Sequence, residues 1–308
     1  MLAVVIVTFN VPAAVLAACL DSVRRGGDCD HVIVVDNGGW AATEVNKAVI
    51  GQQVNKAQAT STLAAPVELV TPGRNLGYGG AANVGFRRAA ELGATVVALL
   101  NDDVEVEPGW LRPLLQALDA DASLGAVQPK LLIAPSENAA RPARVNSVGV
   151  EVGGDGAGRD IGYGQPDGPQ FSAEREIGAF TGGAVLFRSA FLEQTGGFDE
   201  SYFLYYEDLD LARRGAALGW HYRCVPASVI HHRVSASTEQ LGHQARYFQE
   251  RNRLRFAFRH GTPRAIVGAL WLSLRRLRWA PRSAHARALL GGLAAAPRAF
   301  VSRARHGR

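Results

Sequence analysis

Three short apolar runs, each leading directly into polar residues, constrain the fold of this chain more than any other feature. The runs are Leu2–Val7, His31–Asp36 and Val96–Leu100. Between the first two, Ala13–Arg25 carries apolar residues at helical spacing. A strand, a helix and a second strand in this order predict a parallel β-α-β unit with both strand ends at one edge of a sheet. Ligands of open α/β sheets bind at that edge.

An acidic pair follows the third run directly, in the sequence Asn101-Asp102-Asp103. Two adjacent carboxylates repel one another unless a positive charge neutralises them. Mg²⁺ and Mn²⁺ bind carboxylate and phosphate oxygens together, so the pair predicts a metal site for a phosphate-bearing ligand. The alternative is a structural Asp-rich turn before a helix expected at Trp110–Leu118.

A second acidic group, Glu207, Asp208 and Asp210, lies between the aromatic segment Tyr202–Tyr206 and an expected helix, Leu209–Leu218. Aromatic neighbours reduce the hydration of a carboxylate, which raises its pKa and suits a general base. The alternative is an acidic helix start that the helix macrodipole stabilises, without a catalytic role.

The glycine-rich segment Pro72–Gly80 follows a short expected strand, Val67–Val70. Its four glycines, with Arg74 and Asn75, predict a loop that brings backbone N–H groups and a guanidinium against phosphate. A flexible turn is the alternative. A helix from Ala81 to Leu92 is expected to follow, with Asn83 in its first turn.

Paired histidines, His231 and His232, follow the apolar Val229-Ile230. After a strand, and in a chain with an acidic pair, they are candidate metal ligands. A separate short strand is expected before them, at Trp220–Val225.

Two segments between the acidic groups are expected to contact ligands. Ala134–Gly168, rich in Pro, Gly, Asn and Asp, predicts a hairpin and a mobile loop of the kind that often binds ligands. Ile177–Phe187 predicts a strand that Thr181-Gly182-Gly183 interrupts, which suits close approach of a ligand to the backbone.

Composition limits the class of protein. With 308 residues and 47% hydrophobic content, the chain can bury one large core, with or without an appendage. Three cysteines without metal-type spacing favour a reducing, cytoplasmic setting. The first residues show no signal-peptide pattern, and no apolar stretch has the length of a membrane span.

Charge is unevenly distributed along the chain. Residues 251–308 contain 14 Arg and no Asp or Glu, which leaves 19 basic and 28 acidic residues before them. We therefore expect an acidic domain, residues 1–238, and a basic helical extension, residues 239–308, that faces an anionic partner. Its first helix, Gln240–His260, places Tyr247, Arg251, Arg255 and Arg259 on one face.

The second helix of the extension begins at Pro263. Apolar residues line one side and arginines gather near its end, which suits a helix on the inner face of the plasma membrane. The apolar residues are Ile266, Leu270, Leu274 and Leu277. Nucleic-acid binding is a competing use, but no recognised nucleic-acid module accompanies the extension, and we expect no nucleic-acid partner. A solvated basic tail is the other alternative.

Together these motifs resemble family 2 glycosyltransferases of the GT-A fold and, within them, the bacterial rhamnosyltransferase-like branch. The matching segments span nearly all of residues 3–256. They are, in order, VVIVTFN, VIVVDN, GRNLGYGGAANVG, LLNDDVEVEPGWL, TGGAVLFRSAFLEQTGGFDESYFLYYEDLDLARR, and VIHHRVSAS with YFQERNRLRF. The expected fold is therefore a mixed α/β sheet flanked by helices, with a helical extension.

The resemblance implies an inverting transfer of a sugar from a nucleotide donor to an acceptor hydroxyl, assisted by Mg²⁺ or Mn²⁺. It implies dTDP-rhamnose or a UDP-sugar as donor, and a cell-envelope glycan or polyprenyl-diphosphate-linked acceptor. On the donor side, the resemblance assigns nucleoside contacts to Thr8, Asn10, Asp36 and Asn75, and further donor contacts to Arg74, Asn83 and Asp102. It assigns the metal to Asp103 with His232 or His231. It places Gly182 and Gly183 on the acceptor side and assigns the general base to Asp208, beside Glu207.

The chain departs from the family pattern in two places. The acidic motif is Asn-Asp-Asp rather than Asp-x-Asp, and the histidine is doubled, so two assignments stay open. Two other functions also stay open. A sugar nucleotidyltransferase requires a triphosphate loop after the first strand, where Thr8–Pro12 contains no glycine or cation. A catalytically silent sugar- or membrane-binding module requires no base at Asp208.

Overall fold

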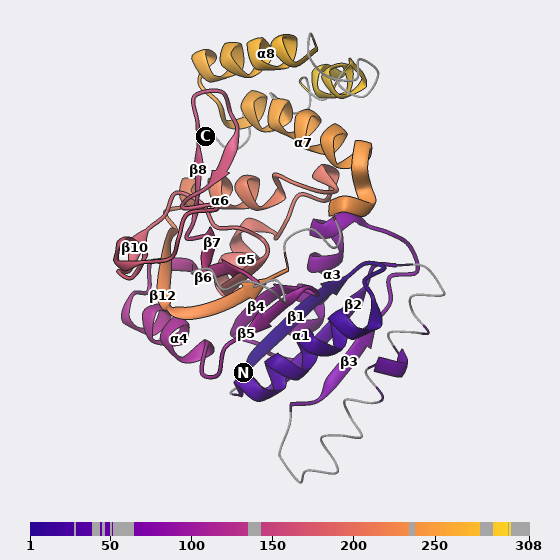
Figure 1. The fold of residues 1–308 in the computed structure, drawn as a ribbon, viewed down its shortest axis with the longest axis vertical. Helices are drawn as coiled ribbons and strands as arrows, with labels where there is room; N and C mark the ends of the chain where they lie inside the picture. The colour runs from indigo at the N-terminus through magenta and orange to yellow at the C-terminus, as the bar shows by residue number, and fades with distance from the viewer. Residues whose placement is uncertain are drawn as a thin grey trace.

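The computed structural model describes residues 1–27, 29–38, 44, 47–49, 51, 65–134, 143–233, 238–277, 286–294 and 296. Its centre is a ten-stranded mixed sheet with helices on both faces, the architecture expected from the sequence (Figure 1). Eight strands run in the order β10-β12-β6-β11-β4-β1-β2-β3, while β5 pairs with β12 and β7 with β6. The strands are β1 (Leu2–Thr8), β2 (His31–Asp36), β3 (Val67–Val70), β4 (Val96–Asn101), β5 (Val104–Val106), β6 (Leu124–Ile133), β7 (Arg144–Ser147), β10 (Arg175–Glu176), β11 (Ala184–Arg188) and β12 (His221–His232).

The N-terminal half of the sheet is parallel, as the β-α-β pattern predicts. β1 pairs in parallel with β2 and β4, and its register places Thr8 beside Asp36 and Val7 beside Asn101. Alternate residues of β1 face opposite cores: Val5 packs toward α3 (Gly77–Glu91), and Ile6 packs toward α1 (Ala13–Gly26). The polar strand ends therefore meet at one edge.

The C-terminal half of the sheet is mixed. β11 runs antiparallel between β4 and β6, and β12 runs parallel to β6. A strand is present where Trp220–Val225 was expected, but its predicted end is wrong, because β12 continues to His232. Its pairing with β6 shifts register between Val225 and Val229, around Pro226, whose missing N–H cannot join the ladder.

Three expected boundaries differ from the observed ones. The strand after Thr181-Gly182-Gly183 begins only at Ala184, and helix α6 (Glu207–Ala217) begins at Glu207, so the acidic group forms its first turn. α3 begins at Gly77 inside the expected glycine loop, which moves Asn83 to the second turn. Gly77 has φ +74°, and an added Cβ would collide with the backbone of Phe203, so this close approach requires glycine.

Between β3 and α7, the described residues form two further helices, two short 3₁₀ helices and a hairpin. They are α4 (Leu111–Ala120), α5 (Ser189–Thr195), the 3₁₀ helices at Pro169–Phe171 and Glu200–Tyr202, and the antiparallel pair β8 (Val150–Val152) and β9 (Gly158–Asp160). The expected hairpin at Ala134–Gly168 is thus present. Residues 135–142, in the part expected as a mobile loop, lie outside the described residues.

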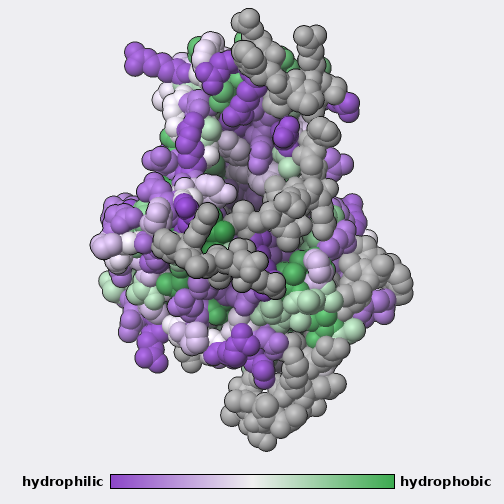
Figure 2. All heavy atoms as spheres, viewed as in Figure 1, coloured by the Kyte–Doolittle hydropathy of each residue, from purple (hydrophilic) through white to green (hydrophobic). Residues whose placement is uncertain are grey.

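Helices α7 (Thr238–His260) and α8 (Pro263–Leu277) stack beyond α6 at one end of the molecule (Figure 1). The expected arginine face of α7 packs on the segment before α6, where Arg255 and Arg259 bind Asp199. The boundary at residue 238 stays a prediction. Figure 2 shows hydrophilic side chains projecting from this end.

The expected apolar face of α8 is partly wrong. Ile266 and Leu270 pack against α7, because Leu254 and Phe258 offer an apolar surface there. The apolar residues that α8 exposes are Val267, Trp271 and Leu274, at 66%, 58% and 57% exposure. Among the described helices, none is long and apolar enough to span a membrane.

Candidate active site

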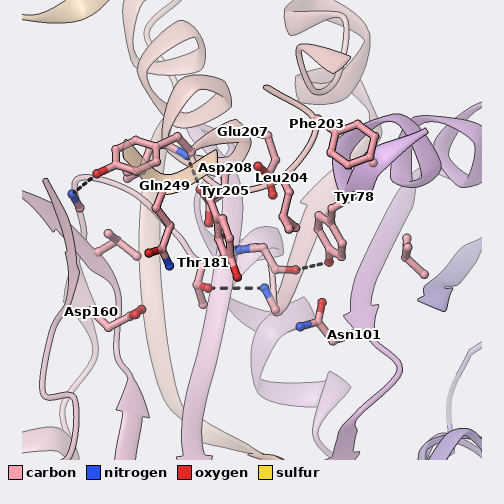
Figure 3. A pocket seen from close by; sticks show the side chains of 18 of the residues that line it. Tyr78, Asn101, Asp160, Thr181, Phe203, Leu204, Tyr205, Glu207, Asp208 and Gln249 are labelled. Carbon is pink, nitrogen blue, oxygen red and sulfur yellow. Dashed lines mark hydrogen bonds between the residues drawn. The ribbon is translucent and has the colours of Figure 1, made fainter. Parts of the chain in front are cut away.

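A cavity of about 570 Å³ opens at the carboxyl ends of β1 and β4 and extends beneath α6, α7 and α8. Residues from distant parts of the chain line it, including Asp102 and Asp103 after β4, Asp208 on α6 and His232 at the end of β12. Figure 3 shows Glu207 and Asp208 entering from one side, with Asn101 and Tyr78 across the cavity from Asp160. The two acidic groups of the sequence therefore meet in one place.

Asp103 and His232 face one another at the sheet end of the cavity. The Asp103 carboxylate is buried, and its Oδ1 lies 3.2 Å from His232 Nε2. His232 Nδ1 lies 2.7 Å from Asn146 Oδ1, which can only accept, so Nδ1 is the donor of this pair. Nε2 is then the ring nitrogen that faces Asp103 Oδ1, an oxygen with no hydrogen-bond donor among the described residues. A metal bound here would take the carboxylate oxygen and this ring nitrogen together.

This donor set fits a divalent cation. No group of three His, Cys, Asp or Glu side chains able to hold a metal occurs in the described part of the chain. However, Mg²⁺ sites at phosphates use one or two protein ligands and complete their coordination with phosphate oxygens and water. Asp103 and His232 provide such a partial set. His231 points elsewhere and lies 3.0 Å from Glu107, which favours His232 as the ligand.

Asp102 differs from Asp103 in its surroundings. It is buried and its Oδ2 accepts a hydrogen bond from the Phe9 N–H at 3.1 Å. Burial raises its pKa to about 7, against the lowering effect of the Thr8 hydroxyl. Asp102 therefore ties the end of β4 to the end of β1, while Asp103 has the freer carboxylate oxygen.

Asp208 is held in a fixed orientation where α6 meets the cavity. Its Oδ2 accepts from the Gly182 N–H at 3.0 Å, and its Oδ1 accepts from the Leu209 N–H at 2.8 Å. Gly182 and Gly183 both line the cavity, and the Gly182 carbonyl accepts from the Tyr78 hydroxyl at 2.6 Å. Burial raises the pKa of Asp208. These properties suit a general base.

Glu207 is buried beside Asp208, and its Oε2 has no partner among the described residues. Burial and the neighbouring Asp208 charge raise the pKa of Glu207 to about 8. Both pKa values are raised because burial disfavours the charged form of each carboxyl, and for Glu207 the charge of the adjacent Asp208 adds to this effect.

The backbone before α6 is strained. Phe203, Tyr205 and Tyr206 have φ values of +68°, +67° and +71°, in the left-handed region that residues with a side chain rarely adopt. The side-chain amide of Asn252, fully buried on α7, donates to the carbonyls of Tyr202, Leu204 and Tyr205 at 2.7–2.9 Å. This clamp holds the strained segment against the start of α6.

Several expected donor contacts lie at the ends of β1 and β2. Asp36 is buried, and its Oδ2 has no partner among the described residues, as expected of a group that awaits a ligand. Thr8 lies beside it in register. Asn75 lines the cavity, and its Oδ1 accepts from Asn37 Nδ2 at 3.0 Å and from the Gly77 N–H at 2.8 Å.

Of the expected donor contacts, Asn75 and Asp102 line the cavity and five do not. Thr8 and Asp36 adjoin the lining residues Phe9 and Asn37, and the other three are Asn10, Arg74 and Asn83. The Asn83 amide is used within the fold: it donates to the Phe198 carbonyl and accepts from the Phe198 N–H, both at 2.9 Å. Its position thus offers no support for a donor contact. Asn10 and Arg74 are exposed near the rim, and Asn10 has φ +52°.

Other lining residues were not among the sequence candidates. Asp160, on β9, has its pKa raised to about 6 by burial, and it shows that the hairpin supplies part of the cavity. Gln249, Arg253 and Arg276, on α7 and α8, also line it. Only the basic composition of the extension indicated these arginines, and it indicated a membrane rather than the cavity.

Sequence comparison matches residues 3–194 to a family described as Glycosyl transferase family 2. An N-acetylglucosaminyl-diphospho-decaprenol L-rhamnosyltransferase of Mycobacterium tuberculosis is 32% identical over 189 residues, which are 56% of this chain and 60% of that protein. An uncharacterized protein of Mycobacterium bovis is 30% identical over 206 residues, 64% of this chain and 70% of that one. The chain thus spans less than two thirds of the rhamnosyltransferase.

Solved structures share the fold at low identity. A structure of GalNAc-T7 with UDP, GalNAc and Mn²⁺ has a TM-score of 0.66 and 14% identity, covering 100% of this chain and 54% of that one. A mannosyltransferase from Pyrobaculum calidifontis, with GDP-Man and Mn²⁺, has a TM-score of 0.57 and 16% identity, covering 99% and 84%. Both neighbours are glycosyltransferases that hold Mn²⁺, and the likeness confirms the expected fold.

Proposed function

The chain belongs to the family 2 glycosyltransferases, and from this premise we propose that it is an inverting, metal-dependent sugar transferase that builds a cell-envelope glycan. The observation that carries the proposal is the single cavity in which Asp103 and His232 face the Glu207–Asp208 pair. Rhamnose from dTDP-rhamnose is the first candidate for the transferred sugar, because the M. tuberculosis relative is named a rhamnosyltransferase. A UDP-sugar is the other donor candidate.

The donor occupies the sheet end of the cavity in this proposal. Asp36, whose Oδ2 has no partner among the described residues, accepts hydrogen bonds from the nucleoside. Thr8 lies beside it in register, and Asn75 contributes from the cavity lining. Asp103 and His232 would hold Mg²⁺ or Mn²⁺, and the bound metal would supply positive charge to the leaving diphosphate. Asp102 fixes the turn that carries Asp103 through its bond to the Phe9 N–H.

The acceptor enters from the opposite side. Asp208 removes the proton of the acceptor hydroxyl while that oxygen bonds to the anomeric carbon, and the bond from this carbon to the diphosphate breaks. Attack on the face opposite the leaving group inverts the anomeric centre. One carboxylate suffices, because the leaving diphosphate needs no general acid of the kind that glycosidases use. The Gly182 and Leu209 N–H groups orient Asp208 for this step.

We further propose that the acceptor is linked to a polyprenyl diphosphate and is reached at the inner face of the plasma membrane, where the enzyme binds as a peripheral protein. The name of the M. tuberculosis relative specifies such an acceptor. On α8, Val267, Trp271 and Leu274 form an exposed apolar stripe at helical spacing, and the Arg275 guanidinium lies 4.9 Å from the Trp271 ring centre. Apolar and basic residues together suit an anionic membrane surface.

The test is a titration of dTDP-rhamnose, UDP-galactose, UDP-glucose and GDP-mannose, with and without Mn²⁺, followed by thermal stability and slow donor hydrolysis. We expect one donor to raise Tm only when Mn²⁺ is present. Asp103→Ala should abolish that metal-dependent shift without lowering the Tm of the free protein by a similar amount. If no donor changes Tm or is hydrolysed, the transferase proposal fails. Dependence on a nucleoside triphosphate with release of pyrophosphate would instead indicate a nucleotidyltransferase.

A further inference from the structure

The cavity has a basic end as well as an acidic one. Five carboxylates line it: Asp102, Asp103, Asp160, Glu207 and Asp208. Among the described lining residues, the only Arg or Lys side chains are Arg253 on α7 and Arg276 on α8. The proposed mechanism uses neither of them.

Arg253 is a fixed, buried cation. It is 1% exposed, and its Nη1 donates to the carbonyls of Asp155 and Ala269, both at 3.0 Å. Its Nη2 donates to Glu250 Oε1 and Ser273 Oγ, both at 2.6 Å. Its Nε is buried and has no partner among the described residues. A buried N–H without an acceptor is costly unless a ligand supplies one.

Arg276 shares its carboxylate partner with Arg253. Its Nη1 lies 2.6 Å from Oε2 of Glu250, and the other oxygen of that carboxylate, Oε1, accepts from Arg253. Two guanidinium groups therefore face one carboxylate, which leaves one positive charge in excess. The Arg276 side chain is 44% exposed, and its Nε and Nη2 have no acceptor among the described residues.

A purely structural role explains only part of this arrangement. Glu250, Arg253 and Ser273 already tie α7 to α8 inside the protein. A half-exposed ion pair from Arg276 adds little stability to such a tie. What Arg276 does add is a planar guanidinium at the cavity whose remaining N–H groups have no acceptor in the described part of the chain. A guanidinium of this kind can bind phosphate oxygens in pairs.

We propose that Arg276, backed by the buried Arg253, forms a subsite for a phosphate group of the acceptor; this inference rests on the proposed transferase function. The donor diphosphate has its own place at Asp103, in the turn after β4, and at His232, on β12, rather than on α7 and α8. The helix that carries Arg276 also carries the exposed apolar stripe. A lipid tail held at that stripe and a phosphate held at Arg276 would present the first sugar of the acceptor to Asp208.

The experiment compares two acceptors that share a terminal sugar: N-acetylglucosaminyl diphosphate on a short polyprenol, and N-acetylglucosamine on an uncharged octyl group. Each is assayed with wild type and with Arg276→Gln, Arg276→Lys and Arg264→Gln, at a donor concentration that saturates wild type. Arg264→Gln is the matched control, because Arg264 is exposed near the start of the same helix and does not line the cavity.

For the diphosphate acceptor, we expect Arg276→Gln to lower kcat/KM by about 10- to 100-fold, the effect of a lost charge-assisted contact. The lysine variant should recover part of this loss. The octyl acceptor and Mn²⁺-dependent donor binding should be unchanged in every variant. Equal losses on both acceptors would indicate a structural role, and weakened donor binding would assign Arg276 to the donor phosphates; either result overturns the inference. Failure of wild type with every donor would instead count against the transferase proposal.

Discussion

Asn252 offers the sharpest test of how the structure positions the proposed base. The change is Asn252→Ala, which removes an amide nitrogen whose two protons serve three backbone carbonyls, of Tyr202, Leu204 and Tyr205. At least one of the two protons is therefore shared between two carbonyl oxygens. Because the residue is fully buried, no water replaces the amide without rearrangement.

The magnitude follows from the same contacts. A net hydrogen bond is worth about 1 kcal/mol, and a buried carbonyl left without a donor costs about 1–3 kcal/mol, so the clamp contributes about 2–5 kcal/mol. The left-handed backbone of Phe203, Tyr205 and Tyr206 costs about 1–2 kcal/mol per residue. The two terms are similar in size. Without the clamp, we expect the segment to relax and to displace Asp208, which follows Tyr206 by two residues.

The assay separates transfer from donor binding. We expect Asn252→Ala to lower kcat by at least about 10-fold, since each 1.4 kcal/mol of positioning free energy is worth a factor of ten. Mn²⁺-dependent stabilisation by the donor should persist, because Asp103 lies in the turn after β4 and His232 on β12, away from the clamped segment. Gln244→Ala, at an exposed site on the same helix, is the control. Unchanged kcat with unchanged Tm would refute the reasoning, and so would loss of donor binding equal to the loss of transfer.

Three further predictions address the base, its neighbour and the membrane. Asp208→Asn should lower transfer by about 10²- to 10⁴-fold while donor binding persists, and wild-type turnover would exclude Asp208 as the base. Burial and Asp208 raise the pKa of Glu207 from 4.5 to about 8, so the folded state holds this proton more tightly than the unfolded state. The free energy of unfolding should therefore fall as pH rises from about 4.5 to about 8, and denaturant titrations should show a flatter dependence for Glu207→Gln. Trp271→Glu should reduce sedimentation with anionic vesicles and leave kcat toward a short soluble acceptor unchanged; equal vesicle binding would reject the α8 stripe as the contact.

The sequence by itself determined the local elements and the chemistry they carry. β-branched runs with polar ends predicted β1, β2 and β4, and helical spacing predicted α1, because each pattern depends only on residues a few positions apart. The Asp102-Asp103 and Glu207-Asp208 pairs were recognisable as candidates for the same reason. Because ligands of parallel α/β sheets bind at the carboxyl ends of the strands, the sequence also predicted that the first pair lies at that edge of the sheet.

Local patterns were least informative where a neighbour from elsewhere decides the outcome. The glycines predicted a loop at Gly77, yet a helix begins there, and the Phe203 backbone lies too close for any side chain at that position. Likewise, Ile266 and Leu270 looked like a membrane face, but α7 covers them. In both cases the deciding contact joins residues that are distant in the sequence, or belong to different helices.

Only the tertiary structure decided which residues share the cavity. Neighbouring residues on a strand point to opposite faces, so the sequence allowed one of His231 and His232 to meet Asp103, and the packing of β12 selected His232. The clamp at Asn252 and the cations at Arg253 and Arg276 reach the cavity from helices that follow the sheet in sequence. No periodicity encodes such encounters, because they depend on how completed elements pack, whereas periodicity records only which side of one element is buried.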